Sequence, residues 1–328
     1  MAGEASFSRT YLALLSTTLD AYLDSGKFTD NIFDATPTLD AFKDKSRTIN
    51  GGYEITVGIM HETNSTAGSY SGYEQLDVTP QEGATRAFYD PKQYSSSISI
   101  SGDETTANAG DAEVIDLLNF KTMQAEMSLA NVLSQGVHSD GTGNSSKDLT
   151  GIAAMIDQTP ATTVYAQINP ANNSAWQNQA ATSVGATATN WVSNNRTQYN
   201  SASQGKGTMS GQPDLGITTQ TVHEAIEALT VPMLRYTGQT TGNAVNLGVE
   251  DIRYKRMRIV WDADCASGVF YGLTMAHAEL VMYRGRDIRS AGTLQKPVNQ
   301  DALVTQVLFK GNLVTNARMK HYVLAGLT

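Results

Sequence analysis

The chain has a single cysteine, Cys265, few charged side chains and no long apolar run. One cysteine cannot form an internal disulfide, so the fold is suited to a reducing compartment. No apolar run approaches the roughly 20 residues that a membrane-spanning helix needs, which argues against a membrane protein. Residues 1–9 contain Glu4 and lack the basic start and apolar core of a secretory signal, so we expect no signal peptide.

The scarcity of charge limits the partners of the protein. Charged residues make up 17% of the sequence, against about 25% in typical soluble domains. The net charge of -9 argues against general nucleic-acid binding, which needs basic surfaces to displace counterions. One basic cluster, residues 253–258, alternates with apolar residues as on a solvated strand. A polar face or an ion-pair partner of another subunit is the favoured interpretation, and a phosphate contact is the minor one.

Residues 158–211 are almost uncharged: Arg196 and Lys206 are their only charged side chains, while Asn, Gln, Ser and Thr dominate. Such a surface forms contacts without the cost of desolvating ions. The segment is either a flexible insertion or an ordered, contact-making subdomain. We favour the second interpretation because aromatic side chains are scarce in disordered segments, and this one contains Tyr165, Trp176, Trp191 and Tyr199.

Residues 53–59 alternate apolar and other side chains with the period of two that is typical of a half-buried strand. A polar stretch follows over 61–86, and the chain returns as a second strand over 94–100. The pattern predicts a very long β-hairpin over 51–101 with an irregular tip. A hairpin of this length cannot bury both faces within its own subunit.

Residues 111–135 run without Gly or Pro and predict one uninterrupted helix of roughly 40 Å. Its expected apolar stripe consists of Leu118, Ala125, Leu129, Val132 and Gly136.

The rest of the sequence predicts an α+β fold. An amphipathic helix is expected over 11–23, followed by a broken link over 31–39. Thr219 or Thr221 would cap a helix that runs to Leu229. Two strands are expected on either side of a hairpin turn at 262–268, and further strands elsewhere; together the strands cover 214–218, 258–261, 268–273, 278–283, 303–309 and 322–324.

No candidate for catalysis or metal binding meets the geometric demands of its chemistry. His223 and Glu224 fail the zinc-protease pattern, because position 227 is Glu. Two carboxylates and a thiol at 262–265 lack a neighbouring histidine, so a turn is the better interpretation. His61-Glu62 and Ser71 lie in the polar tip. We therefore predict no catalytic, cofactor-binding or metal site, and an enzyme is unsupported.

The order of the parts resembles that of a tailed-bacteriophage major capsid protein of the Hong Kong 97-like fold. The resemblance covers essentially the whole chain, and it is carried by several short segments in a fixed order. Besides the hairpin and the long helix, these are residues 31–37, 140–144, 147–151, 213–229, 260–265, 311–313 and 326–328.

The resemblance implies an N-terminal arm, an extended loop, a spine helix, and peripheral and axial domains. The implied boundaries are 1–50 for the arm, 51–101 for the extended loop, 102–150 for the peripheral domain with the spine helix, 151–276 for the axial domain and 277–328 for the peripheral return strands. Some relatives crosslink a lysine of the extended loop, but no motif carries that chemistry to Lys92.

The implied function is structural: hexamers and pentamers of an icosahedral head that encloses double-stranded DNA without sequence-specific binding. Expected partners are copies of the chain, a separate scaffolding protein, a portal and a decoration protein. We expect a scaffold because the arm and the hairpin occupy nearly all residues before the long helix. The implied location is the virion, after assembly in the host cytoplasm. The alternative is an encapsulin-like compartment that encloses cargo protein, and a remoter one is an α+β enzyme with long insertions.

Overall fold

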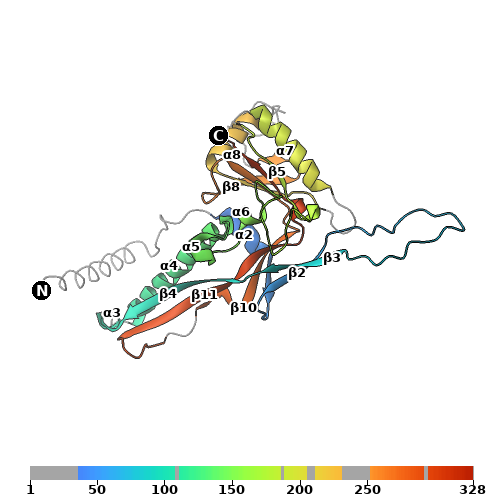
Figure 1. Cartoon of the computed structure of the whole chain (residues 1–328). Coiled ribbons are helices and arrows are strands. Elements are labelled where there is room, and N and C mark those ends of the chain that lie inside the picture. The colour runs from blue at the N-terminus through green and yellow to red at the C-terminus, as the bar shows by residue number, and fades with distance from the viewer. Residues whose placement is uncertain are drawn as a thin grey trace, which may run out of the picture. The chain divides into compact units, whose positions relative to one another are not determined.

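The computed structural model describes residues 36–107, 111–185, 188–204, 211–230, 252–291 and 295–327, with the backbone alone at 105–107, 111–119, 188–189, 230 and 288–291. They belong to one compact unit, Ala35–Thr328. The unit combines helices with three sheets, as the sequence predicts for an α+β fold (Figure 1). The helix expected over 11–23 lies outside the described residues. No helix in the described ranges is long and apolar enough to cross a membrane.

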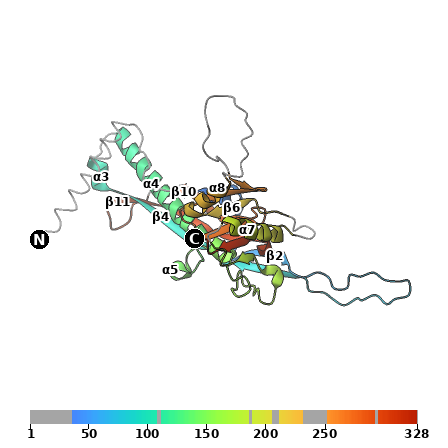
Figure 2. The same ribbon diagram turned by 90° about the horizontal axis from the view of Figure 1, so that it is seen from above.

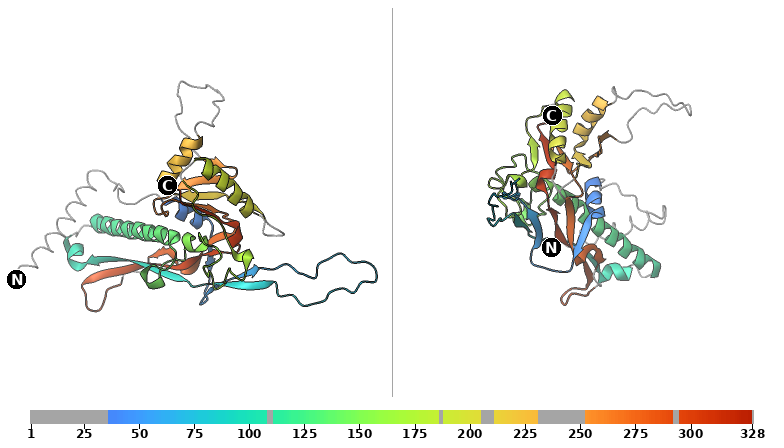
Figure 3. Two further views of the ribbon diagram at one scale, coloured as in Figure 1. Left: turned by 45° about the horizontal axis from the view of Figure 1, so that its top comes forward. Right: turned by 90° about the vertical axis from the view of Figure 1, so that its right-hand side faces the viewer.

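A four-stranded sheet carries the long helix α4 (Asp111–His138), which lies along strands β4 and β11 (Figure 3). The sheet has the order β1-β10-β11-β4, with β1 parallel to β10 and the other pairs antiparallel. Its strands are β1 (Ser46–Ile49), β10 (Ala278–Ala291), β11 (Ala302–Thr315) and β4 (Lys92–Ser101). Helices α2 (Pro37–Asp44) and α3 (Gly102–Ala107) pack beside α4 and β4 respectively.

Helix α4 confirms the prediction for 111–135 and continues to His138. Ala125 and Leu129 are buried as expected, but Val132 is exposed and Leu133 is buried instead. The stripe follows steps of four residues from Ala125 to Leu129, Leu133 and Val137, which keeps it on one face of a helix with 3.6 residues per turn. The prediction that Val132 belongs to the buried stripe was therefore wrong, and its neighbour Leu133 takes that place.

A six-stranded sheet has the order β5-β12-β9-β6-β8-β7. Helices α7 (Ala188–Ser203) and α8 (Gln220–Thr230) pack against it and against each other. The strand and helix predictions for 214–229 and for the later strands are confirmed. The strands are β5 (Gln179–Ala181), β12 (Tyr322–Ala325), β9 (Val269–Leu273), β6 (Leu215–Thr218), β8 (Met257–Trp261) and β7 (Arg253–Tyr254).

Both faces of the six-stranded sheet are covered, which is why β9 is buried along its whole length. Successive side chains of a strand point to opposite faces. Phe270 accordingly packs with Trp191 of α7, while Tyr271 and Leu273 join the larger core beneath the other face. That larger core also contains Leu129 and other side chains of the α4 layer, so the two sheets share one hydrophobic core.

The hairpin expected around residues 262–268 was wrong. Strand β6 lies between β8 and β9, parallel to β8 and antiparallel to β9. The turn is instead fixed to β6: the Asp262 N–H donates to the Thr218 carbonyl at 2.9 Å, and the Thr218 hydroxyl donates to the Val269 carbonyl at 2.9 Å. A strand that ends 44 residues earlier, at Thr218, cannot be recognised from the local pattern of the turn that begins at Asp262.

The long hairpin consists of β2 (Ile55–Met60) and β3 (Ala84–Tyr89), joined by the loop 61–83. The sequence placed the returning strand at 94–100, and that assignment was wrong. Residues 92–101 form β4, which pairs with β11 in the four-stranded sheet. The break falls at Asp90-Pro91, because proline has no N–H to donate to a strand ladder.

Short helical segments complete the described fold. They are α5 (Gly143–Ser146), α6 (Ile152–Met155), η1 (Ser174–Trp176) and η3 (Arg318–Lys320).

Candidate assembly surface

The loop 61–83 extends away from both sheets, as two perpendicular views show (Figures 1 and 2). Residues 62–65 and 67–82 are exposed. Among them are four large apolar side chains, Tyr70, Tyr73, Leu76 and Val78, with Val78 88% exposed. Burial of such a side chain typically contributes about 1.5–3 kcal/mol. Exposed apolar groups gathered on one segment are characteristic of an interaction surface.

Short-range hydrogen bonds shape the loop. The Ser65 hydroxyl donates to Gln81 Oε1 across it at 3.0 Å. The Thr66 N–H donates to Asn64 Oδ1, and the Thr79 N–H donates to Asp77 Oδ1, both at 2.9 Å. These are Asx-turns, in which a side chain replaces a backbone acceptor. The loop therefore has local order without covering its apolar side chains.

The loop is also acidic. Its charged side chains are Glu62, Glu74, Asp77 and Glu82, and it contains no Lys or Arg. A hydrogen bond from the Thr79 side chain and another from the Thr79 N–H lower the pKa of Asp77, which keeps this carboxylate ionised. A surface that receives the loop should therefore present hydrogen-bond donors or positive charge beside its apolar pockets.

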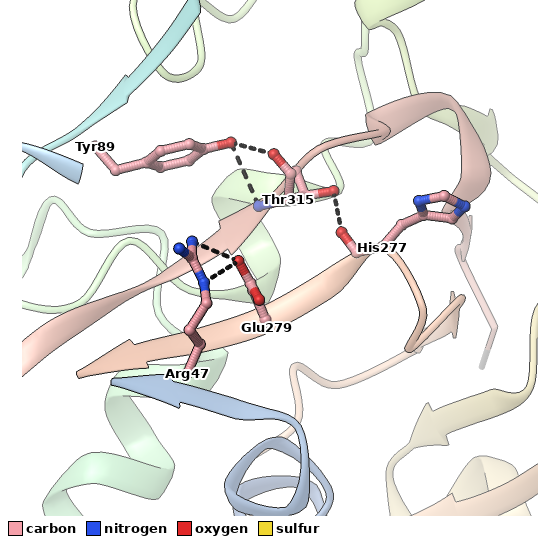
Figure 4. A network of polar contacts seen from close by, with 5 residues as sticks. All are labelled: Arg47, Tyr89, His277, Glu279 and Thr315. Carbon is pink, nitrogen blue, oxygen red and sulfur yellow. Dashed lines mark hydrogen bonds and ion pairs between the residues drawn. The ribbon is translucent and has the colours of Figure 1, made fainter. Parts of the chain in front are cut away.

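The root of the hairpin is fixed to the four-stranded sheet through Tyr89 (Figure 4). The Tyr89 hydroxyl donates to the Thr315 carbonyl at 2.7 Å, and the Thr315 N–H donates to the Tyr89 oxygen at 3.4 Å. The Thr315 hydroxyl donates to the His277 carbonyl at 2.8 Å. This network joins the ends of β3, β10 and β11 in the buried interior.

His321 completes this network. The Thr274 N–H donates to its Nδ1 at 3.2 Å, so Nδ1 carries no proton. Burial lowers the pKa of His321 to about 3, and the imidazole is therefore neutral. The remaining proton lies on Nε2, which donates to Thr315 Oγ1 at 3.1 Å.

Aromatic side chains from the uncharged segment support the root on its other side. The ring of Tyr89 packs edge-on against that of Tyr165, with 5.7 Å between the ring centres. The ring of Tyr165 stacks on that of Trp176, with 6.3 Å between the ring centres. The Phe88 N–H donates to the Ala166 carbonyl at 3.1 Å. The segment 158–211 is thus ordered where it is described, and its first part supports the hairpin. The interpretation as a flexible insertion was wrong there.

The chain that precedes the hairpin is fixed to the same sheet. Strand β1 pairs with β10, and the Arg47 Nε and Nη2 donate to Glu279 Oε1 at 3.1 and 2.8 Å (Figure 4). Both side chains are partly exposed, so the ion pair itself contributes little to stability. The ion pair joins the side chains of β1 and β10 in the register in which the two strands pair.

We predict that Tyr89→Phe lowers the free energy of unfolding by about 1–3 kcal/mol, because it leaves the buried Thr315 carbonyl without its donor. Urea unfolding of the subunit measures the change. Tyr53→Phe is the matched control, since Tyr53 is 88% exposed and its loss of a hydroxyl should change nothing measurable. Equal stability of the two variants would contradict the assigned role of Tyr89.

The chemical candidates from the sequence do not converge into a site. His223 and Glu224 lie on α8, where Glu224 Oε1 accepts from Gln220 Nε2 at 2.9 Å. Asp262 is buried with its carboxylate engaged by Thr38 and Asp264. Burial raises the pKa of the Cys265 thiol to about 12, so it is not a thiolate ligand.

The remaining candidates are equally separate. Ser71 lies in the exposed loop, where its N–H donates to Glu74 Oε2 at 2.9 Å. His61 and Glu62 begin the same loop. Lys92 Nζ donates to the Ser146 carbonyl at 2.7 Å, at the start of β4 and outside the loop. Within the described ranges, no three His, Cys, Asp or Glu side chains are placed to hold a metal ion.

The basic cluster 253–258 forms the β7–β8 turn. Ile252, Met257 and Ile259 are buried, and the Arg and Lys side chains are exposed, as expected for a solvated strand. Lys255 packs back on its own subunit: its Nζ lies 4.6 Å from the centre of the Tyr199 ring and donates to Asn200 Oδ1 at 2.7 Å.

The sequence had pointed to the hairpin as the important element, but it missed the residues that give the loop its character. Tyr70, Tyr73, Leu76 and Val78 were included in a stretch described as polar. Their presence among turn-forming residues was the available signal. The contact of Tyr89 with Thr315 left no signal in the sequence, because the two residues are 226 positions apart.

No protein-family model and no curated protein matches the sequence. Solved structures do match. In a cyanophage A-1(L) capsid asymmetric unit, the matching chain is 15% identical with a TM-score of 0.70, and the match covers 92% of this chain and 95% of that one. A chain of the capsid of a native GTA particle matches at 10% identity, a TM-score of 0.58 and the same coverage. A chain from Mycobacterium phage Bobi matches at 10% identity and a TM-score of 0.51, covering 92% and 93%.

These matches define the class of the fold. The chain has the Hong Kong 97-like fold of tailed-phage capsid proteins over nearly its whole length, and the fold predicted from the sequence is confirmed. The first two of these neighbours come from capsids.

Proposed function

We propose that this chain is the major capsid protein of a tailed phage, and that it assembles into hexamers and pentamers of an icosahedral head around double-stranded DNA. The observation that carries the proposal is the exposed loop 61–83, with apolar side chains that its own subunit leaves uncovered, on the fold of capsid proteins. Copies of the chain are the simplest source of a cover for it.

Within that proposal, the domain boundaries keep the values given by the sequence. Residues 1–50 form the arm, 51–101 the extended loop, 102–150 with 277–328 the peripheral domain, and 151–276 the axial domain. The four-stranded sheet with α4 and the six-stranded sheet with α7 and α8 support this division, except that β12 (Tyr322–Ala325) belongs to the six-stranded sheet. The shift of β4 into the four-stranded sheet favours a shorter extended loop, β2 to β3.

Assembly follows from the physical properties of the hairpin. Its apolar side chains would leave water on contact with the next subunit, and its two strands can offer main-chain hydrogen bonds. The network around Tyr89 and Thr315 holds the root in one direction, so less freedom is lost on docking. The acidic loop would meet exposed cations of a neighbour.

The proposed partners beyond the chain itself are a separate scaffolding protein, a portal and a decoration protein. Hexamers and pentamers of one sequence differ in curvature, so another chain has to set the size of the shell. The net charge of -9 favours enclosure of DNA without sequence-specific binding. The proposed location is the virion, with assembly in the host cytoplasm.

Electron microscopy of the purified native particle tests the function. An icosahedral shell tens of nanometres across, with DNA inside, is the expected result. A shell filled with protein would instead favour the encapsulin-like compartment. A stable monomer or dimer as the only native state would overturn both.

A further prediction concerns the uncharged segment, which we propose contacts neighbouring subunits near a symmetry axis. On α7, Ser193 and Thr197 are exposed. The double change Ser193→Glu and Thr197→Glu should reduce the yield of particles about tenfold in 0.1 M salt, because symmetry mates then repel one another. In 1 M salt, where the Debye length is about 3 Å, the yield should recover. Particle yield is measured by light scattering.

The matched control places Gln at both positions, which preserves size and helix propensity without charge. Normal assembly of the Glu variant at both salt concentrations would show that this face of α7 is only solvated. Failure of the Gln control would indicate a steric effect and not a charge effect.

A further inference from the structure

Asp262 lies where three distant elements meet. It follows β8, and its Oδ2 is 3.4 Å from Nε2 of His138, the last residue of α4. The same oxygen accepts from the Thr38 N–H, in the first turn of α2, at 3.3 Å. The side chains of His138 and Asp262 are only 4% and 1% exposed. A single buried carboxylate thus links the α2–α4 pair to the six-stranded sheet.

The carboxylate of Asp262 suits the N-terminal end of α2. Helix α2 has no side-chain hydrogen bond from its own N-cap residue, Thr36. Asp262 supplies the missing acceptor from 224 residues away, and a carboxylate at a helix N-terminus is favoured by the helix dipole. His138, the last residue of α4, faces the same carboxylate with its Nε2.

The surrounding polar atoms are incompletely satisfied. Thr38 Oγ1, Ser134 Oγ and both ring nitrogens of His138 are buried without the geometry of a hydrogen bond. Ser134 lies one turn before His138 on α4. Buried polar atoms are nearly always paired, because leaving them unpaired is costly. The cost is recovered when the contact opens, so this junction is poised to separate more easily than an apolar one.

We propose that Asp262, His138 and Thr38 form a charge-gated clamp, which holds α2 and α4 against the turn after β8 and frees the start of α2 when the charge of Asp262 is removed. The clamp acts on the point where the chain enters the described fold. Leu39 and Phe42 of α2 stay in the hydrophobic core, so the release affects the first turn of α2 and leaves the fold intact. The proposal does not depend on shell assembly.

The groups that face Asp262 come from every neighbouring element. Helix α4 contributes His138 and Ser134, and α2 contributes the Thr38 N–H and hydroxyl. Its own turn contributes the Asp264 N–H, at 3.1 Å from Oδ1, and the neutral thiol of Cys265. Beyond that thiol lies Tyr271 of β9, whose pKa burial raises, so its hydroxyl is neutral.

The sign of the pH dependence follows from the carboxylate. Burial alone would raise the pKa of Asp262, but His138 and the Thr38 N–H outweigh it and lower the pKa from 3.8 to about 2. A depressed pKa contributes stability that is fully present above 3.8 and is lost as the pH falls toward 2. The clamp therefore opens at the acid end through Asp262.

Hydrogen exchange of the full-length chain tests the clamp, with the amides of α2 compared with those of α8 as an internal reference. Asp262→Asn keeps the shape and removes the charge. The expected result is about a tenfold or larger loss of protection at Thr38, because a hydrogen bond to a charged acceptor is lost, with α8 unchanged. Asp264→Asn is the matched control, since Asp264 contributes only its N–H, and it should behave as the unchanged protein.

Two further measurements separate a clamp from ordinary packing. Combining Asp262→Asn with His138→Gln should cost less protection at Thr38 than the sum of the single effects, because each change breaks the same contact. In the unchanged protein, protection at Thr38 corrected for intrinsic exchange should fall between pH 3.8 and pH 2 before that of α8. Additive effects, equal protection at Thr38 in Asp262→Asn and the unchanged chain, or simultaneous loss with α8 would each overturn the proposal.

Discussion

Replacement of the loop 61–83 by Asn-Gly is expected to abolish shell assembly and to leave the subunit folded. Met60 and Ala84 pair directly at the end of the hairpin, and Asn-Gly is the favoured two-residue connection for such a pair. In the described part of the chain, the hydrogen bonds of residues 62–82 have both partners inside the loop. The free energy of unfolding should therefore change by less than about 0.5 kcal/mol.

The readouts are particle yield by electron microscopy and urea unfolding of the subunit. A second variant tests which property of the loop matters. It keeps the length and the Asx-turns and replaces Tyr70, Tyr73, Leu76 and Val78 by Ser. If apolar contact drives docking, this variant should fail to assemble as completely as the shortened one. Normal particles from the shortened variant would disprove the role of the loop.

The largest expected loss of stability comes from Arg318→Met. Arg318 is fully buried. Its Nε donates to the Met155 carbonyl at 2.8 Å and its Nη2 to the Ala154 carbonyl at 3.4 Å, which satisfies the C-terminal end of α6. Its guanidinium lies 5.1 Å from the centre of the Tyr165 ring. Methionine fills the space but donates nothing, so we expect the free energy of unfolding to fall by roughly 3–5 kcal/mol.

Arg286→Met is the control for this change. Arg286 is exposed, and its Nη1 donates to Gln93 Oε1 at 2.8 Å, so its replacement should cost about 0.5 kcal/mol or less. Urea unfolding of both subunits gives the comparison. Similar stabilities would mean that solvent or backbone rearrangement replaces the buried guanidinium, contrary to its assigned role.

The elements with strong local patterns could be predicted from the sequence. Residues 111–135 lack Gly and Pro, and the strands predicted at 278–283 and 303–309 are present, although both run further than the local pattern indicated. Local pattern does not determine which strands pair. The local pattern placed the returning strand of the hairpin at 94–100, but the strand ladder breaks at Pro91 and residues 92–101 pair with β11. It also paired β8 with β9, but β6 lies between these two strands.

The sequence predicted where the candidate assembly surface lies, but not that its exposed side chains are partly apolar. A hairpin too long to bury itself indicated the element, but its apolar tip was described as polar. The buried contacts of Tyr89 with Thr315, Arg318 with Met155 and Asp262 with Thr38 had no signal in the sequence, because the partners lie 163 to 226 positions away. Asp262 was considered only as a metal ligand or a turn residue, and its contact with His138 and Thr38 depends on how three elements meet.

The sequence separation of Tyr89 and Thr315 also determines when their contact can form during synthesis of the chain. The hairpin root receives its anchor only after 226 further residues have been synthesised, which takes about 10–45 s at 5–20 residues per second. Until then, Tyr89 at the end of β3 cannot make its contact with Thr315, although the contacts of the hairpin root with Tyr165 and Ala166 can form earlier. During synthesis the loop is therefore complete well before the contact that fixes the hairpin root to the four-stranded sheet can form.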